Sequence, residues 1–201
     1  NASFYLAAVD STNFSGANLA SATLTIEFID ANFSHANLTG AQILCLTFSS
    51  TTDFTGAQIR GATLQGGYSG LLDSQLYTTA SYQERYLRGV ALLVMDMNGW
   101  DLSWQNLTDA SLLFTSVAGA DFTGAVIRGT DFGFSGITSD QLYQTASYHE
   151  GDLTGIGLWR NDLSGANFAG KTLHNADLSE TDLTGADFRH ANLTYASCDY
   201  A

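Results

Sequence analysis

The stretch ADLSETDLTGADFRHANL, residues 176–193, places a large apolar residue at every fifth position. An α-helix presents the same face about every 3.6 residues and a flat strand every second residue, so neither buries a five-residue series on one side. The spacing therefore predicts a chain that turns a corner once in each five-residue unit. The four large residues of the stretch are Leu178, Leu183, Phe188 and Leu193.

The same five-residue unit recurs along nearly the whole chain. A small residue usually stands two positions before the large one, as at Ala57, Ala120 and Ala186, and Asp or Asn often stands directly before it. One large and one small inward residue in every five would fill a narrow column, while the other positions stay polar and outside. An internal repeat of this kind predicts a solenoid, and we expect a single repeat domain over residues 1–201.

This pattern resembles the pentapeptide repeat family, whose consensus is Ala, then Asp or Asn, then Leu or Phe, then two variable residues. The resemblance implies an all-β fold, a right-handed quadrilateral β-helix in which four five-residue faces make one coil. It also implies that the large residue and the small residue two before it point inward. About 37 units then give a solenoid of about nine coils.

The four-sided coil can be tested within the sequence. When the large residues are numbered in order and every fourth is assigned to one face, one face collects nine large residues, of which eight are aromatic. The face that follows, from Leu19 to Leu193, has none. We therefore predict a coil of 20 residues with an aromatic ladder along one side. The predicted ladder consists of Phe14, Phe33, Phe54, Tyr82, Phe122, Tyr148, Phe168 and Phe188.

Two similar segments, residues 69–82 and 135–148, interrupt the rhythm. Each is predicted to be a short helical excursion from the wall, over about residues 71–81 and 137–147, and Thr138 with Gln141 has the spacing of a capping box. Two interpretations remain open for the large side chains of the excursions. Either they fold back and cover the wall, or they form a paired docking feature. These side chains are Leu76, Tyr77, Leu142 and Tyr143.

The charge of the chain limits its partners. Lys and Arg number 7 against 20 Asp and Glu, a formal charge of -13, which makes direct binding to nucleic acid unlikely and disfavours anionic lipid. No apolar run is long enough for a membrane span. Cys45 and Cys198 are too few for a disulfide framework. The compartment stays open; a start at Asn1 and few Lys residues favour export to the periplasm or exterior, although a trimmed chain would explain the start equally.

We expect neither catalytic residues, nor a cofactor, nor a metal site. The four histidines fall at outward positions of the repeat, and none has a carboxylate or Cys partner at a spacing typical of a metal site. Asp and Asn recur directly before the large residues, where short polar side chains favour tight turns. We therefore interpret them as repeat residues that bond to the backbone. The histidines are His35, His149, His174 and His190.

One outward face carries apolar residues on an otherwise polar surface. Such an apolar strip marks an interface or lies beneath something. The excursions could cover it, a second copy of the chain could contact it, or it could be a dedicated site for a protein partner. The predicted strip consists of Ile26, Leu44, Leu93, Val94, Leu113, Phe114, Phe134 and Trp159.

These features favour a non-enzymatic structural scaffold or a protein-protein interaction module that acts through the solenoid surface. One alternative is a DNA-mimic inhibitor of a topoisomerase such as gyrase, because some members of the resembled family mimic the size and charge of DNA. Another is a subunit that assembles end to end, since open coil edges favour another chain. The partner is accordingly an unknown protein or a second copy.

Overall fold

The computed structural model describes residues 3–5, 11–25, 30–44, 48–65 and 70–201. The chain forms two compact units, Asn1–Asp96 and Met97–Ala201, and each is described here by itself. That the whole chain makes one domain stays a prediction.

Each five-residue unit closes a tight turn. The carbonyl oxygen of Phe14 accepts a hydrogen bond from the N–H of Ala17 at 2.9 Å, and Gly16 between them has φ +66°. A positive φ at the third residue of such a turn is the mark of type II, which favours Gly because other side chains are strained there. The Asn13 side chain accepts from the N–H of Ser15 at 2.9 Å. The polar residue before the large one therefore serves the backbone of its own turn.

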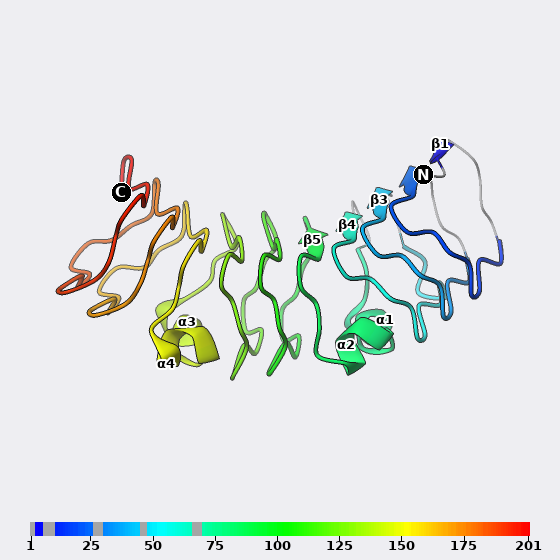
Figure 1. Ribbon diagram of the computed structural model, residues 1–201, viewed down its shortest axis with the longest axis horizontal. Helices are drawn as coiled ribbons and strands as arrows, with labels where there is room; N and C mark the ends of the chain where they lie inside the picture. Colours follow the sequence, from blue (N-terminus) through cyan, green and yellow to red (C-terminus); the bar gives the residue numbers. More distant parts are fainter. Residues whose placement is uncertain (1–2, 6–10, 26–29, 45–47, 66–69) are drawn as a thin grey trace. The chain divides into compact units, whose positions relative to one another are not determined.

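The first unit contains a parallel sheet in the order β1-β2-β3-β4-β5 (Figure 1). Its strands pair in register from coil to coil, so that Leu24, Ile43, Leu64 and Leu92 stack on one another. All four are buried, and they form one inner wall of the core. The strands are β1 Ser3–Tyr5, β2 Thr23–Thr25, β3 Gln42–Leu44, β4 Thr63–Gln65 and β5 Ala91–Leu93.

The second unit stacks its coils through isolated parallel bridges. Asp101 pairs with Asp121 and Asn106 pairs with Val126, in both cases with the partner 20 residues further on. Twenty residues are four five-residue units, so one coil has four faces. Both units are right-handed quadrilateral β-helices, as the sequence predicts.

The aromatic residues stack in runs within each unit. The rings of Phe14 and Phe33 are nearly parallel with centroids 5.1 Å apart, and Phe33 and Phe54 follow at 5.3 Å. Phe168 and Phe188 stack in the same way at 5.1 Å in the second unit. Offset stacking of this kind adds about 0.5–1.5 kcal/mol per pair to the burial of the rings.

The inclusion of Tyr82 and Tyr148 in this ladder is wrong. Both are half-buried, whereas Leu76 and Leu142 of the excursions are fully buried, as is Phe122. Helical turns replace the five-residue units at these places, so the spacing that assigns each Tyr to the interior no longer applies. The leucines fold back into the core instead of facing a partner.

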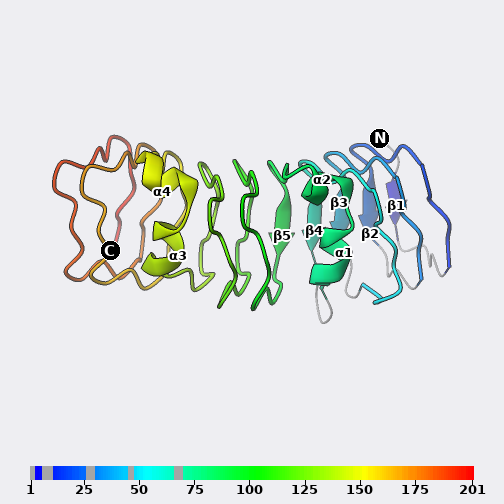
Figure 2. The same ribbon diagram turned by 90° about the horizontal axis from the view of Figure 1, so that it is seen from below.

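Each excursion is a pair of short helices packed against the outside of the coils (Figures 1 and 2). The second pair begins with a capping box: the Thr138 hydroxyl accepts from the N–H of Gln141 at 3.2 Å, and the Gln141 side chain accepts from the N–H of Thr138 at 3.0 Å. The helices are α1 Asp73–Tyr77, α2 Ala80–Gln83, α3 Ser139–Tyr143 and α4 Ala146–Glu150.

In each excursion a glutamine side chain replaces a donor that is missing from the ladder of backbone hydrogen bonds between coils. In regular coils the carbonyl of the small residue accepts from a backbone N–H of the next coil, as Ala17 accepts from Asn37 at 2.9 Å. At the second excursion, Nε2 of Gln141 donates instead to the carbonyl oxygens of Ala120 and Val117, at 2.9 and 2.8 Å. Because a buried carbonyl needs a donor, this amide restores the ladder. In the first excursion Gln75 donates in the same way to Ser49 and Thr52, at 2.9 and 2.8 Å.

Hydroxyl groups join the second excursion to the coils on both of its sides. The buried Ser147 Oγ accepts from the N–H of Ile127 at 2.9 Å on the preceding coil. On the following coil, the N–H of Asn167 donates to Tyr143 Oη at 2.7 Å, and Tyr148 Oη donates to the carbonyl oxygen of Asn167 at 2.6 Å. The two tyrosines therefore replace both backbone bonds that a regular coil would make there.

Candidate functional site

Three aromatic side chains of the second unit form an exposed aromatic cluster: Phe114 and Phe134, which are exposed, and Trp159, which is half-buried. The ring centroids of Phe114 and Phe134 are 5.9 Å apart, and those of Phe114 and Trp159 are 5.6 Å apart, both edge to face. Phe114 is 48% exposed and Phe134 is 57% exposed. The helical excursion of this unit therefore leaves these rings uncovered. Leu113 of the predicted strip stands beside them and is half-buried.

Both phenylalanines occupy the strained position of the repeat turn. Phe114 has φ +56° and Phe134 has φ +53°. The turns close through hydrogen bonds from Thr115 to Leu112 at 3.2 Å and from the residue after Phe134 back to Phe132 at 3.1 Å. A left-handed conformation costs a residue with a side chain about 1–2 kcal/mol, and a bulky one is a clear outlier. Each of the two rings nevertheless stays about half exposed, so burial offsets little of this strain.

Trp159 reaches the cluster by lying over a glycine. Phe134 donates its N–H to the carbonyl of Trp159 at 2.9 Å, and Phe114 donates to the carbonyl of Gly133 at 3.0 Å, which places the residues on three successive coils. A Cβ at Gly133 would collide with the indole of Trp159. The missing side chain therefore lets the indole bend across one coil and contact Phe114.

A buried amide holds the backbone beneath the cluster. Asn161 is 4% exposed, and its Nδ2 donates to the carbonyl oxygens of Phe132 and Leu158, both at 2.9 Å. Its Oδ1 accepts from the N–H of Gly136 at 2.8 Å. Nδ2 also lies 3.3 Å from the carbonyl oxygen of Trp159. The Asn161 side chain therefore contacts four backbone groups around the cluster. The exposed rings stand on a rigid base.

The cluster borders a shallow depression of about 410 Å³. Phe114 and Phe134 form its apolar sides, and Arg160 stands at its margin. Ligand sites in proteins are concave and mostly apolar, with a few polar groups. The depression is large enough for one side chain of a partner. It is lined by Phe114, Ser116, Phe134, Ser135, Gly136 and Arg160.

Arg160 is the cation of this site, and it is already paired. Its Nε lies 2.7 Å from Oε2 of Glu180, and its guanidinium carbon lies 5.3 Å from the centre of the Trp159 ring. The carboxylate of Asp131 accepts from the N–H of Gly133, the glycine that the indole covers, at 2.8 Å. The electrostatic surroundings of the cluster are therefore acidic on balance.

The other arginines of the second unit are paired as well. Arg128 lies 3.2 Å from Asp152, and Arg189 lies 2.7 Å from Asp187. Hydrogen bonds from the side chain and the backbone of Arg189 lower the pKa of the Asp187 carboxyl to about 2. Asp187 therefore keeps its charge far into the acid range.

The first unit does not carry the predicted strip in continuous form. Ile26 lies outside the described residues. Leu44 and Leu93 are half-buried, and the register of the sheet places Gln65 directly between them. Val94 is exposed and has φ +58°. A polar side chain thus interrupts the apolar row in this unit, because the coil of Leu64 has no apolar residue after it.

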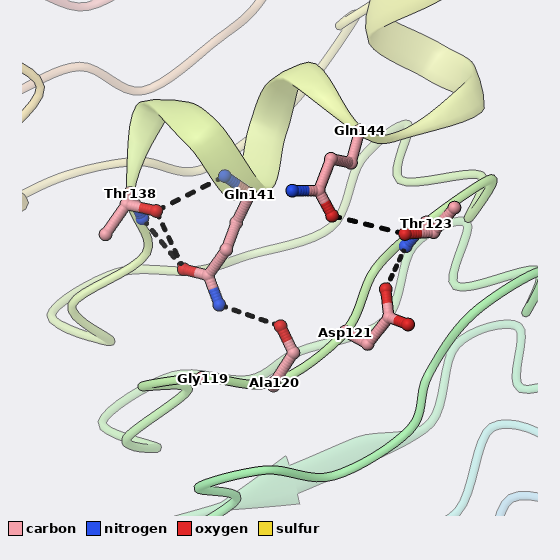
Figure 3. Close-up of a pocket in the computed structure, with 7 residues that line it drawn as sticks. All are labelled: Gly119, Ala120, Asp121, Thr123, Thr138, Gln141 and Gln144. Atoms are coloured by element: carbon pink, nitrogen blue, oxygen red, sulfur yellow. Dashed lines mark hydrogen bonds between the residues drawn. The ribbon is translucent and has the colours of Figure 1, made fainter.

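A second hollow lies under the helices of the second unit (Figure 3). It measures about 380 Å³, and a similar hollow of about 260 Å³ lies under the first excursion. The Thr123 hydroxyl donates to Gln144 at 3.2 Å, and the N–H of Thr123 donates to Asp121 at 2.8 Å. These polar groups, like Gln141, hold the excursion in place, so we assign them a structural role. The larger hollow is lined by Gly119, Ala120, Asp121, Thr123, Thr138, Gln141 and Gln144.

The described residues contain neither a metal-type cluster nor a membrane-type helix. No group of three or more His, Cys, Asp or Glu side chains in that part of the chain could hold a metal ion. None of the helices in the described ranges has the length and apolar character of a membrane-spanning helix. His174 packs edge to face on Tyr195 at 5.5 Å.

The fold defines a class of proteins, the quadrilateral β-solenoids built from five-residue repeats. Sequence patterns described as "Pentapeptide repeats (8 copies)" match residues 26–66, 106–135, 162–194 and 172–201, which is more than half of the chain. The chain belongs to the pentapeptide repeat family. Members of this family are generally structural or interaction proteins rather than enzymes.

Several solved pentapeptide repeat structures are similar to this chain. HetL, involved in heterocyst differentiation regulation in the cyanobacterium Nostoc sp. strain PCC 7120, is 25% identical with a TM-score of 0.24; the match covers 98% of this chain and 65% of HetL. The fluoroquinolone resistance protein QnrB1, plasmid-mediated, is 14% identical with a TM-score of 0.31, over 94% of this chain and 92% of QnrB1. This chain thus spans less than two thirds of HetL. No curated protein sequence matched.

Proposed function

We propose that this protein is a non-enzymatic interaction module and that the exposed aromatic cluster of Phe114, Phe134 and Trp159 is its contact surface for a protein partner. One observation carries the proposal: three aromatic rings from successive coils contact one another at the surface, and the two phenylalanines among them are about half exposed at strained turn positions. Backbone strain that no burial repays points to a functional role. Exposed aromatic residues are also the commonest energetic anchors of protein interfaces.

The rigid base of the cluster supports the same function. Asn161 fixes the backbone below, and Gly133 leaves the space that the indole of Trp159 fills. A contact surface that is ordered before binding loses less entropy when the partner arrives. The cluster therefore has the properties of a prearranged docking site.

Photo-crosslinking tests the proposal directly. A photoreactive amino acid is placed at Phe134 and, as a matched control, at Trp104, which is 59% exposed and also has a positive φ in the same unit. We expect a crosslinked protein adduct in the source cells at position 134 and none at position 104. If neither position, or both equally, gave adducts, the cluster would not be the contact surface.

The two alternatives from the sequence stay predictions. The DNA-mimic alternative rests on the charge of -13 and the repeat fold, and a supercoiling assay with gyrase would test it. The end-to-end assembly alternative would be tested by the concentration dependence of light scattering. No contact in the described residues favours either of them over the cluster.

A further inference from the structure

We propose that the aromatic cluster receives a cationic, apolar segment of its partner, in which Lys or Arg residues alternate with large aliphatic side chains. This inference rests on the proposed function, because it names the chemistry of the partner that binds there. It assigns the apolar residues of the segment to the depression and its cations to the surrounding carboxylates and ring faces.

The second unit as a whole is strongly acidic. This unit holds four Lys and Arg against 13 Asp and Glu, a formal charge of -9. Each of its three arginines is already paired with a carboxylate, at 2.7 to 3.2 Å. The field around the unit therefore attracts cations and repels a second copy of the same surface.

The charged groups next to the aromatic rings also favour a cationic partner. Arg160 is neutralised by Glu180 and lies on the Trp159 ring, so it does not repel an incoming cation. The faces of exposed aromatic rings attract the side chains of Lys and Arg. The Asp131 carboxylate accepts from the N–H of Gly133, the glycine that the indole covers, and adds a negative charge near the cluster.

The depression beside the rings favours an apolar side chain of the partner. Its volume of about 410 Å³ and its two phenylalanine sides suit a large aliphatic side chain. Burial of such a side chain supplies affinity, whereas charge complementarity mainly supplies specificity and a faster association rate. A partner segment with only cationic residues would leave the aromatic rings exposed to water. A segment with only apolar residues would gain nothing from the negative electrostatic potential of the second unit.

Three short synthetic peptides test the inference with the full chain. In the first, Lys alternates with Leu; in the second, Glu replaces Lys; in the third, Ser replaces Leu. Binding is measured by calorimetry, and its site by two-dimensional NMR. The variant F114N/F134N removes both rings while keeping the turn, because Asn tolerates positive φ. The matched control W104N removes an exposed ring at another turn.

We expect the Lys and Leu peptide to bind about tenfold or more tightly than either other peptide. We expect F114N/F134N to lose that binding by a similar factor and W104N to keep it. Equal affinity for the Glu peptide or for the Ser peptide would overturn the inference, and so would unchanged binding to F114N/F134N. Sedimentation that shows wild-type dimers but F114N/F134N monomers would make a second copy the occupant.

The outcomes of the two experiments are separable. If crosslinks form at position 134 but the peptides bind alike, the contact surface stands and the cationic partner is wrong. If no crosslinks form and the peptides also bind alike, both proposals fail.

Discussion

Nε2 of Gln141 lies 2.9 Å from the carbonyl oxygen of Ala120, at the place where a backbone N–H of the next coil binds in the regular repeats. The chain leaves the wall at this coil, so a side-chain amide takes the place of the lost backbone donor. A buried carbonyl without a donor is costly. This one contact therefore lets a solenoid carry a helical excursion without losing its ladder.

Replacement of Gln141 by Met should lower the free energy of unfolding by about 1–3 kcal/mol, because the carbonyl of Ala120 loses its donor. Denaturant unfolding measures the effect. The control is Gln144→Met, whose exposed side chain accepts a hydrogen bond from the Thr123 hydroxyl at 3.2 Å, and we expect a change of about 0.5 kcal/mol or less there. Equal losses in the two variants would contradict the role of Gln141.

Phe132 and Phe134 are two residues apart and should respond in opposite ways. Phe132 is fully buried, so Phe132→Ala should cost about 3–5 kcal/mol. Phe134 is exposed at a positive φ, so Phe134→Asn should change stability by less than about 1 kcal/mol, since relief of strain offsets the lost ring contact. Thermal or denaturant unfolding compares them. A large loss in Phe134→Asn would show that the ring serves stability and would weaken the proposed function.

Gly133 and Trp159 should be energetically coupled. Gly133→Ala introduces a methyl group into the space of the indole and should cost about 1–3 kcal/mol, with a red shift of the Trp fluorescence as the ring becomes exposed. In a Trp159→Ala background the same change should cost almost nothing. A double-mutant cycle measures the coupling. Additive effects would mean that the indole does not depend on the glycine.

Stability at alkaline pH should depend on Tyr148. Burial and the neighbouring Tyr143 raise the pKa of Tyr148 above its usual 10.0. The folded state therefore holds this proton more tightly than the unfolded state, so the contribution is fully present below pH 10 and is lost as the pH rises through the raised pKa. We expect Tyr148→Phe to be less stable than wild type at neutral pH, because the bond to Asn167 is lost, and the difference to shrink above pH 10.

Unfolding measured from pH 8 to 11 checks this expectation, with the exposed Tyr200→Phe as control. A difference between wild type and Tyr148→Phe that stays constant over this range would refute the assignment.

The sequence alone was sufficient for the regular part of the fold. The five-residue period predicts the four-sided coil, and the face assignment places Phe14, Phe33 and Phe54 in one stack, as observed. It fails at Tyr82 and Tyr148, because a helical turn advances the chain by a different rule and places Leu76 and Leu142 inside. The period is informative only where the repeat itself continues.

The site was predicted in part. Leu113, Phe114, Phe134 and Trp159 are brought together on one unit, but the prediction did not include the contributions of Gly133 and Asn161. Gly133 and Asn161 could have been noticed in the sequence, since each replaces the residue type that is usual at its position in the repeat. What each of them contacts depends on the residues of the neighbouring coil.

The sequence by itself determined which residues face inward and which turn positions face solvent, because both follow from a local five-residue rule. Only the tertiary structure decided how the side chains of neighbouring coils contact one another. Bridged residues are 19 apart at Asn13 and Asn32, 20 apart at Asp101 and Asp121, and 26 apart at Asp131 and Gly157. The offset of 26 residues spans the second excursion, and the packing of its helices sets the point at which the chain rejoins the wall. The aromatic cluster spans the coils on either side of such an excursion, so its existence is a consequence of tertiary packing.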